Sequence, residues 1–211
     1  MAKKQLFLDI DTQFDFLSRK GKLYVPNAET IVDKISQTRK FALDNGFSIL
    51  ASVDWHSLDD AEISLQPDNK KTFPPHCLAG QPGSERVGFL GDVPIEYAQL
   101  EKMKKLQLKK LVDKPQFHVV VRTNTVDMFE NPNTLYLLSV IGPKTIVVFG
   151  VALDVCVRNA VEGLLRWGKC SVILLKDVTK GLGIIKEKAL LTDFAERGVQ
   201  IKTLAELKRE F

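Results

Sequence analysis

Cysteine is scarce in this 211-residue sequence, and Cys77, Cys156 and Cys170 are too few and too far apart for a disulfide framework or a zinc knuckle. An odd number of thiols favours a reducing, cytoplasmic setting. Long apolar runs are also missing, so no segment is expected to cross a membrane. The formal net charge of +4 is too small to indicate a nucleic-acid or lipid partner.

The sequence contains no internal repeat, low-complexity segment or linker, so residues 1–211 are expected to form a single domain. Apolar, β-branched segments alternate with segments that have helical spacing. The expected strands are 5–11, 47–53, 117–121, 144–149, 171–175 and 199–202. This alternation predicts an α/β fold, a Rossmann-like sandwich whose mostly parallel sheet has about six strands and helices on both faces.

Two further stretches affect the expected topology. Residues 97–112 carry apolar side chains near one face and lysines elsewhere, which predicts a solvated surface helix. Residues 57–96 hold most of the prolines and several glycines, so they are expected to form a long irregular excursion. Excursions of this length are usually functional or disordered. This one begins at the carboxyl end of a strand, where parallel sheets place their binding sites.

The most informative stretch is 147–158, where a buried strand is followed by Gly150 and then by Cys156 at the start of a helix. The unpaired N–H groups and the dipole of a helix N-terminus favour an anion. We therefore expect this position to lower the pKa of the thiol and to make Cys156 a nucleophile. The alternative is a small buried cysteine that fills space beside the sheet.

A carboxylate is expected beside this cysteine. Asp11 ends a strand that should neighbour the strand before Cys156, and it could accept the thiol proton and return it to a leaving amine. Asp9 competes for this role, and an aspartate here could instead cap a turn. Backbone N–H groups around Ala152 and Cys156 could form an oxyanion hole, which would fit acyl transfer by a cysteine.

A second polar group follows the next expected strand. Asp54 and His56 lie on the same side of an extended segment, and Glu62 and His76 follow in the proline-containing excursion. Asp, His and Glu side chains suit Zn²⁺, Mn²⁺ or Fe²⁺, with zinc as the first expectation. A D-x-H pair also arises by chance, so a structural role for these residues stays open.

Three segments together resemble the isochorismatase-like cysteine hydrolases, most closely their nicotinamidase (pyrazinamidase) branch. Residues 8–16 are similar to the D-x-Q-x-D-F segment of the family. Residues 51–56 and 73–77 resemble the metal loop that separates nicotinamidases from metal-free relatives, and residues 150–157 are similar to the nucleophile motif. The resemblance extends over nearly the whole chain, with the segments in the same order.

The resemblance implies catalytic roles for two positions and a special backbone conformation at a third place. Counting back from the end of the first segment makes Asp11 the catalytic aspartate, and the third segment makes Cys156 the nucleophile. The family has a non-proline cis peptide in this motif, and Val151–Ala152 is the matching bond.

The resemblance also implies a metal site and a substrate site. Asp54, His56 and His76 match the family's metal ligands, and Glu62 falls where members have His or Glu. Phe16 and Phe73 match aromatic walls around the substrate.

The chain departs from the family at one catalytic position. The family's triad includes a lysine soon after the third strand and before a D/S-x-F element, which here is 127–129. Counting back from that element places Thr123 at the lysine position, whereas counting from the strand end places Arg122 there. Arginine keeps the positive charge but does not readily exchange a proton, and threonine does neither. A structural role for Arg122 is equally open.

The resemblance therefore implies a metal-dependent cysteine amidohydrolase that converts nicotinamide and water to nicotinate and ammonia through a thioester on Cys156. One alternative is a catalytically impaired relative that binds a metal or ligand. Another is a cysteine hydrolase for a different amide or carbamoyl substrate. The expected partner is a small-molecule amide, and a homo-oligomer is usual for the family.

Overall fold

A single parallel sheet organises the chain. The computed structural model describes residues 5–68 and 71–210, and within them seven strands form one sheet in the order β3-β4-β2-β1-β5-β6-β7. Every neighbouring pair is parallel. The strands are β1 (Gln5–Ile10), β2 (Ser48–Asp54), β3 (Ile95–Ala98), β4 (His118–Thr123), β5 (Thr145–Val151), β6 (Ser171–Lys180) and β7 (Gln200–Lys202).

The predicted α/β fold is confirmed, with one strand more than expected. The additional strand is β3, which lies in the segment predicted as the end of a loop and the start of a helix. The helix itself begins only at Lys105. β3 is a short edge strand with half-exposed and exposed residues, so it lacks the apolar run of a buried strand. These residues form a strand because they hydrogen-bond to β4, a partner that the sequence of β3 does not itself specify.

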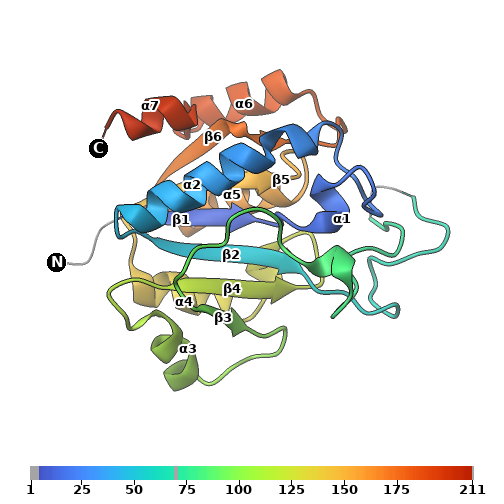
Figure 1. The fold of residues 1–211 in the computed structure, drawn as a ribbon, viewed down its shortest axis with the longest axis horizontal. Coiled ribbons are helices and arrows are strands. Elements are labelled where there is room, and N and C mark those ends of the chain that lie inside the picture. The colour runs from blue at the N-terminus through green and yellow to red at the C-terminus, as the bar shows by residue number, and fades with distance from the viewer. Residues whose placement is uncertain (1–4, 69–70, 211) are drawn as a thin grey trace.

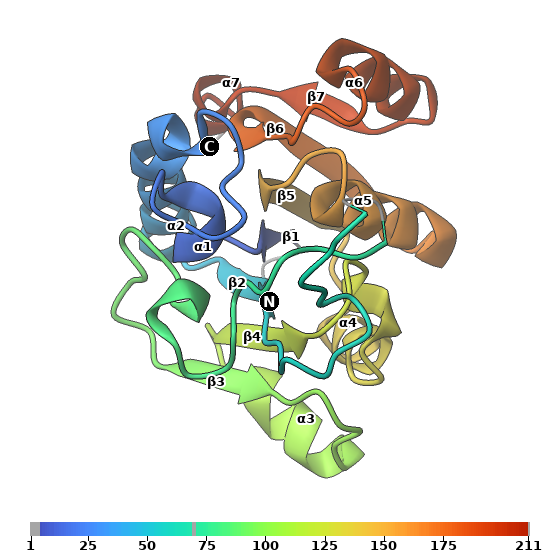
Figure 2. The ribbon, with the colours of Figure 1, turned by 90° about the vertical axis from the view of Figure 1, so that its right-hand side faces the viewer.

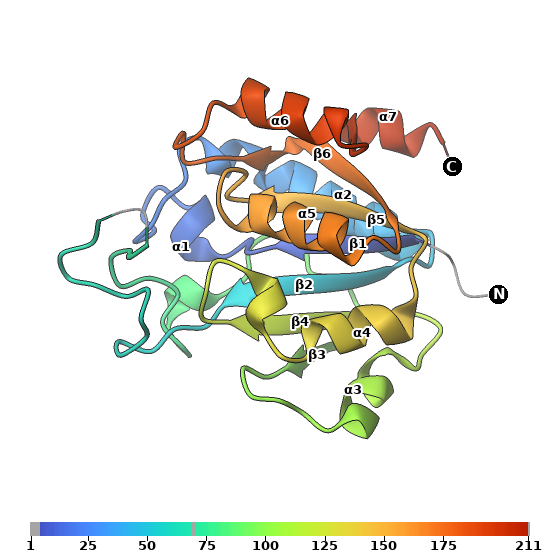
Figure 3. The same ribbon diagram turned by 180° about the vertical axis from the view of Figure 1, so that it is seen from behind.

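Helices cover both faces of the sheet (Figures 1 and 3). One face packs against α1 (Phe14–Leu17), α2 (Val32–Asp44) and α7 (Leu204–Lys208). The other packs against α3 (Lys105–Val112), α4 (Thr134–Ile141), α5 (Cys156–Trp167) and α6 (Glu187–Glu196). Short 3₁₀ turns occupy Ala28–Ile31, Pro82–Ser84 and Met128–Glu130. Within the described ranges, no helix is long and apolar enough to cross a bilayer.

Helix α5 follows directly from its sequence. Val157, Ala160, Val161 and Leu164 recur at helical spacing, and all four are completely buried against the sheet. The helix ends at Gly168, whose φ of 64° is the left-handed conformation that closes many helices. Its first residue is Cys156, so burial of the apolar stripe also fixes the position of the thiol.

The crevice between β1 and β5 is the switch point of the sheet. The chain leaves β1 toward α2 on one face and leaves β5 toward α5 on the other, so the two connections separate at the carboxyl ends of these strands. Figure 2 views the molecule from this end, where the long segment between β2 and β3 lies across the strand ends.

The two central strands also approach closely. Ile10 pairs with Gly150, which has a φ of 122°. A Cβ atom at this glycine would lie 2.1 Å from the carbonyl oxygen of Ile10, so any other residue would push the strands apart.

A buried ion network fastens α2 and a neighbouring loop to β1. Oδ2 of Asp9 accepts a hydrogen bond from Nε of Arg39 (2.7 Å) and another from Arg86, and the Asp9 and Arg39 side chains are fully buried. Arg39 also donates to the carbonyl oxygens of Val87 (2.5 Å) and Phe89 (3.2 Å). Although burial raises the pKa of Asp9, the two guanidinium groups lower it to about 2. Asp9 is thus a structural anion.

We predict that Asp9→Asn destabilises the protein, because it leaves two buried guanidinium groups without their carboxylate. The free energy of unfolding should fall by about 3–5 kcal/mol, as for other buried pairs that lose one partner. Urea unfolding followed by circular dichroism measures it. The matched control is Asp44→Asn, which breaks an exposed pair with Lys40 and should have little effect. Equal losses in both variants would contradict the structural role of Asp9.

Candidate active site

Asp11 and Cys156 meet at the switch point of the sheet. Asp11 directly follows β1 with a φ of 47°, a left-handed conformation that aspartate tolerates better than most residues. Its Oδ1 accepts a hydrogen bond from Oγ of Ser52 (2.6 Å), and the Cys156 thiol lies close enough to the same carboxyl group for each to shift the pKa of the other. Both residues are buried, with exposed fractions of 3% for Asp11 and 9% for Cys156. Asp9, the competing carboxylate, is engaged in the ion network instead.

The electrostatics of this pair differ from the prediction. Burial raises the pKa of the Cys156 thiol well above its usual range, and the negative charges of Asp11 and Asp54 raise it further. Burial and Asp54 also raise the pKa of Asp11. The expectation that the helix N-terminus lowers the pKa of the thiol is therefore wrong, because burial and two carboxylates raise it.

The loop before Cys156 is held rigidly. The buried carboxylate of Asp154 accepts hydrogen bonds from the backbone N–H groups of Leu182 (2.8 Å) and Ile184 (2.7 Å). The Val151–Ala152 peptide is cis, at the position expected from the sequence. The Ala152 backbone lowers the pKa of the Cys156 thiol, against the larger effects of burial and the carboxylates, so it lies near the sulfur.

Asp54, His56 and His76 form a cluster suited to a metal ion. One ligand atom from each side chain can be chosen so that all three lie within 4.8 Å of one another, and all three residues are buried. Oδ2 of Asp54 is 3.3 Å from Nε2 of His76 and 3.6 Å from Nε2 of His56. Although burial raises the pKa of Asp54, the two imidazoles lower it to about 2, so the carboxylate is ionised.

The second nitrogen of each imidazole is held by another group. Nδ1 of His76 lies 2.8 Å from the carbonyl oxygen of Pro74, which can only accept, so Nδ1 donates. Nδ1 of His56 lies 3.2 Å from Oδ2 of Asp60. Such bonds leave Nε2 of a neutral ring free to bind a metal. Nε2 of His56 is in fact buried without a hydrogen-bond partner among the described residues.

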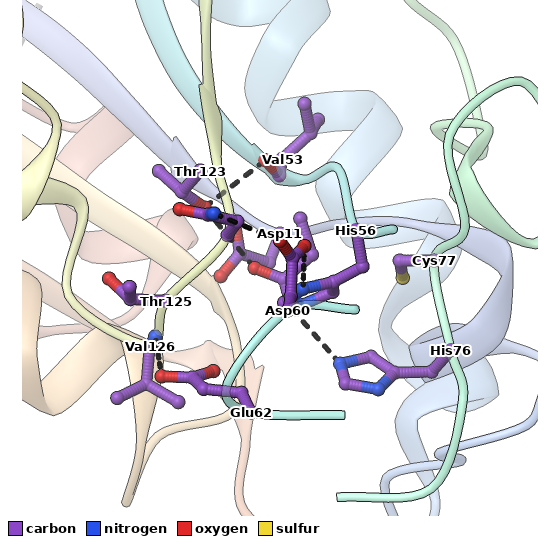
Figure 4. A network of polar contacts seen from close by, with 12 residues as sticks. Asp11, Val53, His56, Asp60, Glu62, His76, Cys77, Thr123, Thr125 and Val126 are labelled. Atoms are coloured by element: carbon purple, nitrogen blue, oxygen red, sulfur yellow. Dashed lines mark hydrogen bonds and ion pairs between the residues drawn. The ribbon is translucent and has the colours of Figure 1, made fainter. Parts of the chain in front are cut away.

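Glu62 lies outside this three-residue cluster (Figure 4). Its Oε1 accepts a hydrogen bond from the backbone N–H of Val126 (2.9 Å). Burial raises the pKa of Glu62, and the charge of Asp54 raises it further. The carboxyl group of Glu62 therefore lies close enough to the cluster to interact with it electrostatically. The predicted role of Glu62 as a metal ligand stays a prediction.

Two residues of the segment 11–16 connect the parts of the site. The side chain of Gln13 bonds both the N–H (2.8 Å) and the carbonyl oxygen (2.8 Å) of Asp54, and it also donates to the carbonyl oxygen of Ser84. Asp15 accepts a hydrogen bond from the N–H of Cys77 (2.7 Å), the residue after His76. The D-x-Q-x-D pattern therefore serves as a scaffold for the metal cluster.

Arg122 and Thr123 point in different directions because side chains alternate along β4. The Arg122 guanidinium lies 4.1 Å from the ring centre of Trp55 and 4.8 Å from that of Tyr97, and it donates to Gln99. The structure thus places Arg122 in an aromatic sandwich. Oγ1 of Thr123, by contrast, lies 3.2 Å from Oδ1 of Asp54, inside the site.

The two residues predicted as aromatic walls, Phe16 and Phe73, both pack against His76. The ring centres of Phe16 and Phe73 lie 5.4 Å and 6.2 Å from that of His76, and both residues are buried. A cavity of about 680 Å³ borders both His56 and His76 and is also lined by Lys20. Phe16 and Phe73 do not line this cavity, so their contact with substrate stays a prediction.

Sequence reasoning missed several supporting residues. Ser52 faces Asp11 because β1 and β2 pair in register, which the sequence does not specify. Asp60 lies four residues after His56, and this short spacing was only a weak indication in the sequence that the two side chains would meet. Gln13 and Asp154 lie within the quoted motifs, but only the structure reveals what their side chains hold.

The assembled groups can perform hydrolysis through a covalent intermediate. The Cys156 thiol, a side chain capable of nucleophilic attack, lies beside the Asp11 carboxyl group, which is capable of accepting a proton. Three side chains that could hold a metal ion lie on the neighbouring strand end and loop. This set fits acyl transfer from an amide to a thiol.

Comparisons with known proteins agree with this chemistry. A family model described as "Isochorismatase domain" matches residues 98–206. The nicotinamidase/pyrazinamidase of Mycobacterium tuberculosis is 26% identical over 197 residues, which cover 91% of this chain and 95% of that protein.

Solved structures share the fold. The pyrazinamidase of Pyrococcus horikoshii in complex with zinc has a TM-score of 0.74 and 24% identity, covering 95% of this chain and 99% of that one. The N-carbamoylsarcosine amidase of Thermoplasma acidophilum has a TM-score of 0.68 and 18% identity, covering 94% and 95%.

We predict that Cys156 in the metal-free protein reacts slowly with iodoacetamide at neutral pH and speeds up only above the ordinary thiol pKa of about 8.5. Asp11→Asn removes a negative charge that raises the pKa of the thiol, so it should lower that pKa and accelerate the reaction. Mass spectrometry of the Cys156 peptide separates this thiol from Cys170. Asp44→Asn is the control. A wild-type thiol that titrates below the ordinary range would contradict the prediction.

Proposed function

The chain belongs to the isochorismatase domain family, and we propose that it is a metal-dependent cysteine amidohydrolase of the nicotinamidase type. It would convert nicotinamide and water into nicotinate and ammonia. One observation carries the proposal: the Asp11–Cys156 pair and the Asp54, His56 and His76 cluster share the carboxyl end of one sheet. Supporting it, the curated relative at 26% identity is a nicotinamidase/pyrazinamidase.

The reaction follows from the groups present. As the Cys156 sulfur attacks the carboxamide carbon, Asp11 takes the thiol proton. Backbone N–H groups around Ala152 and Cys156 would stabilise the negative charge that develops on the carboxamide oxygen. Asp11 then returns the proton to the leaving nitrogen, the C–N bond breaks, and ammonia departs from a thioester. Water, deprotonated by Asp11, attacks the thioester carbon; the C–S bond breaks, nicotinate leaves, and Asp11 returns the proton to the Cys156 sulfur.

The donor set fits a divalent cation. Two imidazoles and a carboxylate are ligands typical of Zn²⁺, with Mn²⁺ and Fe²⁺ as further candidates. The unpartnered Nε2 of His56 and the ionised Asp54 give the cluster a free lone pair and a negative charge. A bound cation would supply a Lewis-acid site for the ring nitrogen of nicotinamide. A cytoplasmic location fits the free thiols Cys77, Cys156 and Cys170.

A second candidate is a hydrolase for a different amide or carbamoyl compound. The observation that favours it is the side chain at Thr123, which is neutral and bonded to Asp54 rather than cationic and directed at the thiol. After burial, the largest contributions to the raised pKa of Cys156 come from the carboxylates of Asp11 and Asp54. Such a site could suit a substrate that carries its own positive charge.

We predict that purified protein supplied with Zn²⁺ releases ammonia from nicotinamide. Cys156→Ala should lower kcat about a thousandfold or more, because it removes the nucleophile. Cys170→Ser is the control, since Cys170 belongs to neither cluster. A coupled ammonia assay measures both variants.

Each outcome of this assay is informative. Equal turnover by wild type and Cys156→Ala would sink the thioester mechanism. If wild type binds Zn²⁺ but leaves nicotinamide intact, while releasing ammonia from a carbamoyl amine, the second candidate replaces the first.

Metal removal gives a separate prediction. Dialysis against a chelator should stop ammonia release, and added Zn²⁺ should restore it. His56→Ala should remain inactive after the same addition, because it lacks the free Nε2 ligand. Full activity after chelation, with metal content verified by elemental analysis, would refute metal dependence.

A further inference from the structure

The segment that leaves β4 contacts the metal loop at three points. Residues 123–126 lie along the loop 54–62, and three of the four donate a hydrogen bond to an acidic side chain in it. Figure 4 shows this arrangement, with Thr123 at one end and Val126 beside Glu62. The contacting residues lie more than sixty positions apart in the sequence, and no sequence motif predicted these contacts.

The first contact orients the carboxylate ligand. Thr123 pairs with Asp54 in the parallel register of β4 and β2, and its exposed fraction is 3%. Oγ1 of Thr123 lies 3.2 Å from Oδ1 of Asp54 and 3.2 Å from the carbonyl oxygen of Val53. Oδ2 of Asp54 is the oxygen that faces both imidazoles. The hydroxyl has one proton to share between these two acceptors, and its contact with Oδ1 favours the orientation of the carboxylate in which Oδ2 is directed at the metal position.

The second contact orients an imidazole through an intermediate residue. Nδ2 of Asn124 donates to Oδ1 of Asp60 (3.2 Å), and Oδ2 of Asp60 lies 3.2 Å from Nδ1 of His56. Asp60 also accepts a hydrogen bond from the N–H of Ser57 (2.8 Å). With both carboxylate oxygens engaged, Asp60 holds the ring of His56 so that Nε2 points into the cluster.

The third contact holds the far end of the loop. The backbone N–H of Val126 donates to Oε1 of Glu62 (2.9 Å). Thr125, between the second and third contacts, differs from its neighbours because, among the described residues, its hydroxyl hydrogen-bonds only the backbone of Asp127. The segment therefore contains a natural internal control.

We propose that Thr123, Asn124 and Val126 form a metal-loop clamp, in which Thr123 and Asn124 are positioning residues that act on a bound divalent cation through Asp54 and Asp60. The clamp rests on the proposed function, because it needs a metal at the Asp54, His56 and His76 cluster. It assigns Thr123 to the geometry of the metal site rather than to proton transfer at Cys156. Thr123 and Asn124 thereby extend the site beyond its ligands.

The test compares Zn²⁺ affinity among four variants prepared metal-free. Thr123→Val keeps the shape of the side chain and removes the hydroxyl, and Asn124→Ala removes the amide. Both should weaken Zn²⁺ binding by roughly 10–100-fold, the usual cost of losing a residue that orients a metal ligand. Thr123→Ser, which keeps the hydroxyl, should bind close to wild type. Thr125→Val makes the same substitution at a residue whose hydroxyl contacts the backbone of Asp127 instead of the metal loop, so it should leave the Zn²⁺ affinity unchanged.

A spectroscopic readout separates positioning from folding. Co²⁺ at saturating concentration reports ligand geometry through its visible absorption, so Thr123→Val should change the spectrum while Thr123→Ser and Thr125→Val reproduce wild type. Thermal unfolding of each metal-free variant checks that it folds. Should Thr123→Val fail to fold, Asn124→Ala alone decides: weakened Zn²⁺ binding supports the clamp and unchanged binding overturns it.

The outcomes distinguish the clamp from the proposed function. If wild type binds Zn²⁺ and both Thr123→Val and Asn124→Ala bind as tightly as Thr125→Val, the clamp is wrong and the metal site stands. If Thr123→Ser binds as weakly as Thr123→Val, the hydroxyl is not the active group and the clamp is also wrong. If wild type binds no Zn²⁺, the metal part of the proposed function fails and the clamp fails with it.

Discussion

The buried carboxylate of Asp54 is the group on which the site depends. Its backbone is bonded on both sides by Gln13, its Oδ1 by Thr123, and its Oδ2 faces two imidazoles. An ionised carboxylate that is shielded from solvent needs partners of this kind. An isolated buried charge costs several kcal/mol, which is on the order of the free energy of unfolding of a whole domain. The strands, the irregular loop and the first segment of the chain all contribute one of these partners.

The same charge sets the conditions for the thiol. Asp54 and Asp11 both raise the pKa of Cys156, so the protein surrounds its nucleophile with negative charge rather than with a neutralising cation. A divalent ion held by Asp54 would reverse that balance. Under the proposed function, metal binding and thiol chemistry would therefore be linked through Asp54, the residue that Gln13 and Thr123 contact.

Strong local patterns in the sequence made the central strands and part of the candidate site predictable. The buried strands β1, β2, β4 and β5 each contain a run of apolar residues, and such runs between turn signals favour a buried strand. Asp11 and Cys156 could be paired in advance because each ends or follows a central strand, and parallel strands carry their carboxyl ends to one edge. β3 could not be predicted, since a short edge strand depends on its partner. Asp60 was missed for a similar reason, because its function lies in a contact to Asn124 and His56.

The sequence by itself determined the class of fold, the order of its central strands along the chain, and the residue types available at the strand ends. Only the tertiary structure decided how those residues act. Alternation along β4, set by the sheet, sends Arg122 between two aromatic rings and Thr123 to Asp54. Desolvation, which no local pattern reports, turns the expected lowering of the Cys156 pKa into a rise. Hydrogen-bond partners, burial and charge are properties of neighbours in space, and the chain acquires them only on folding.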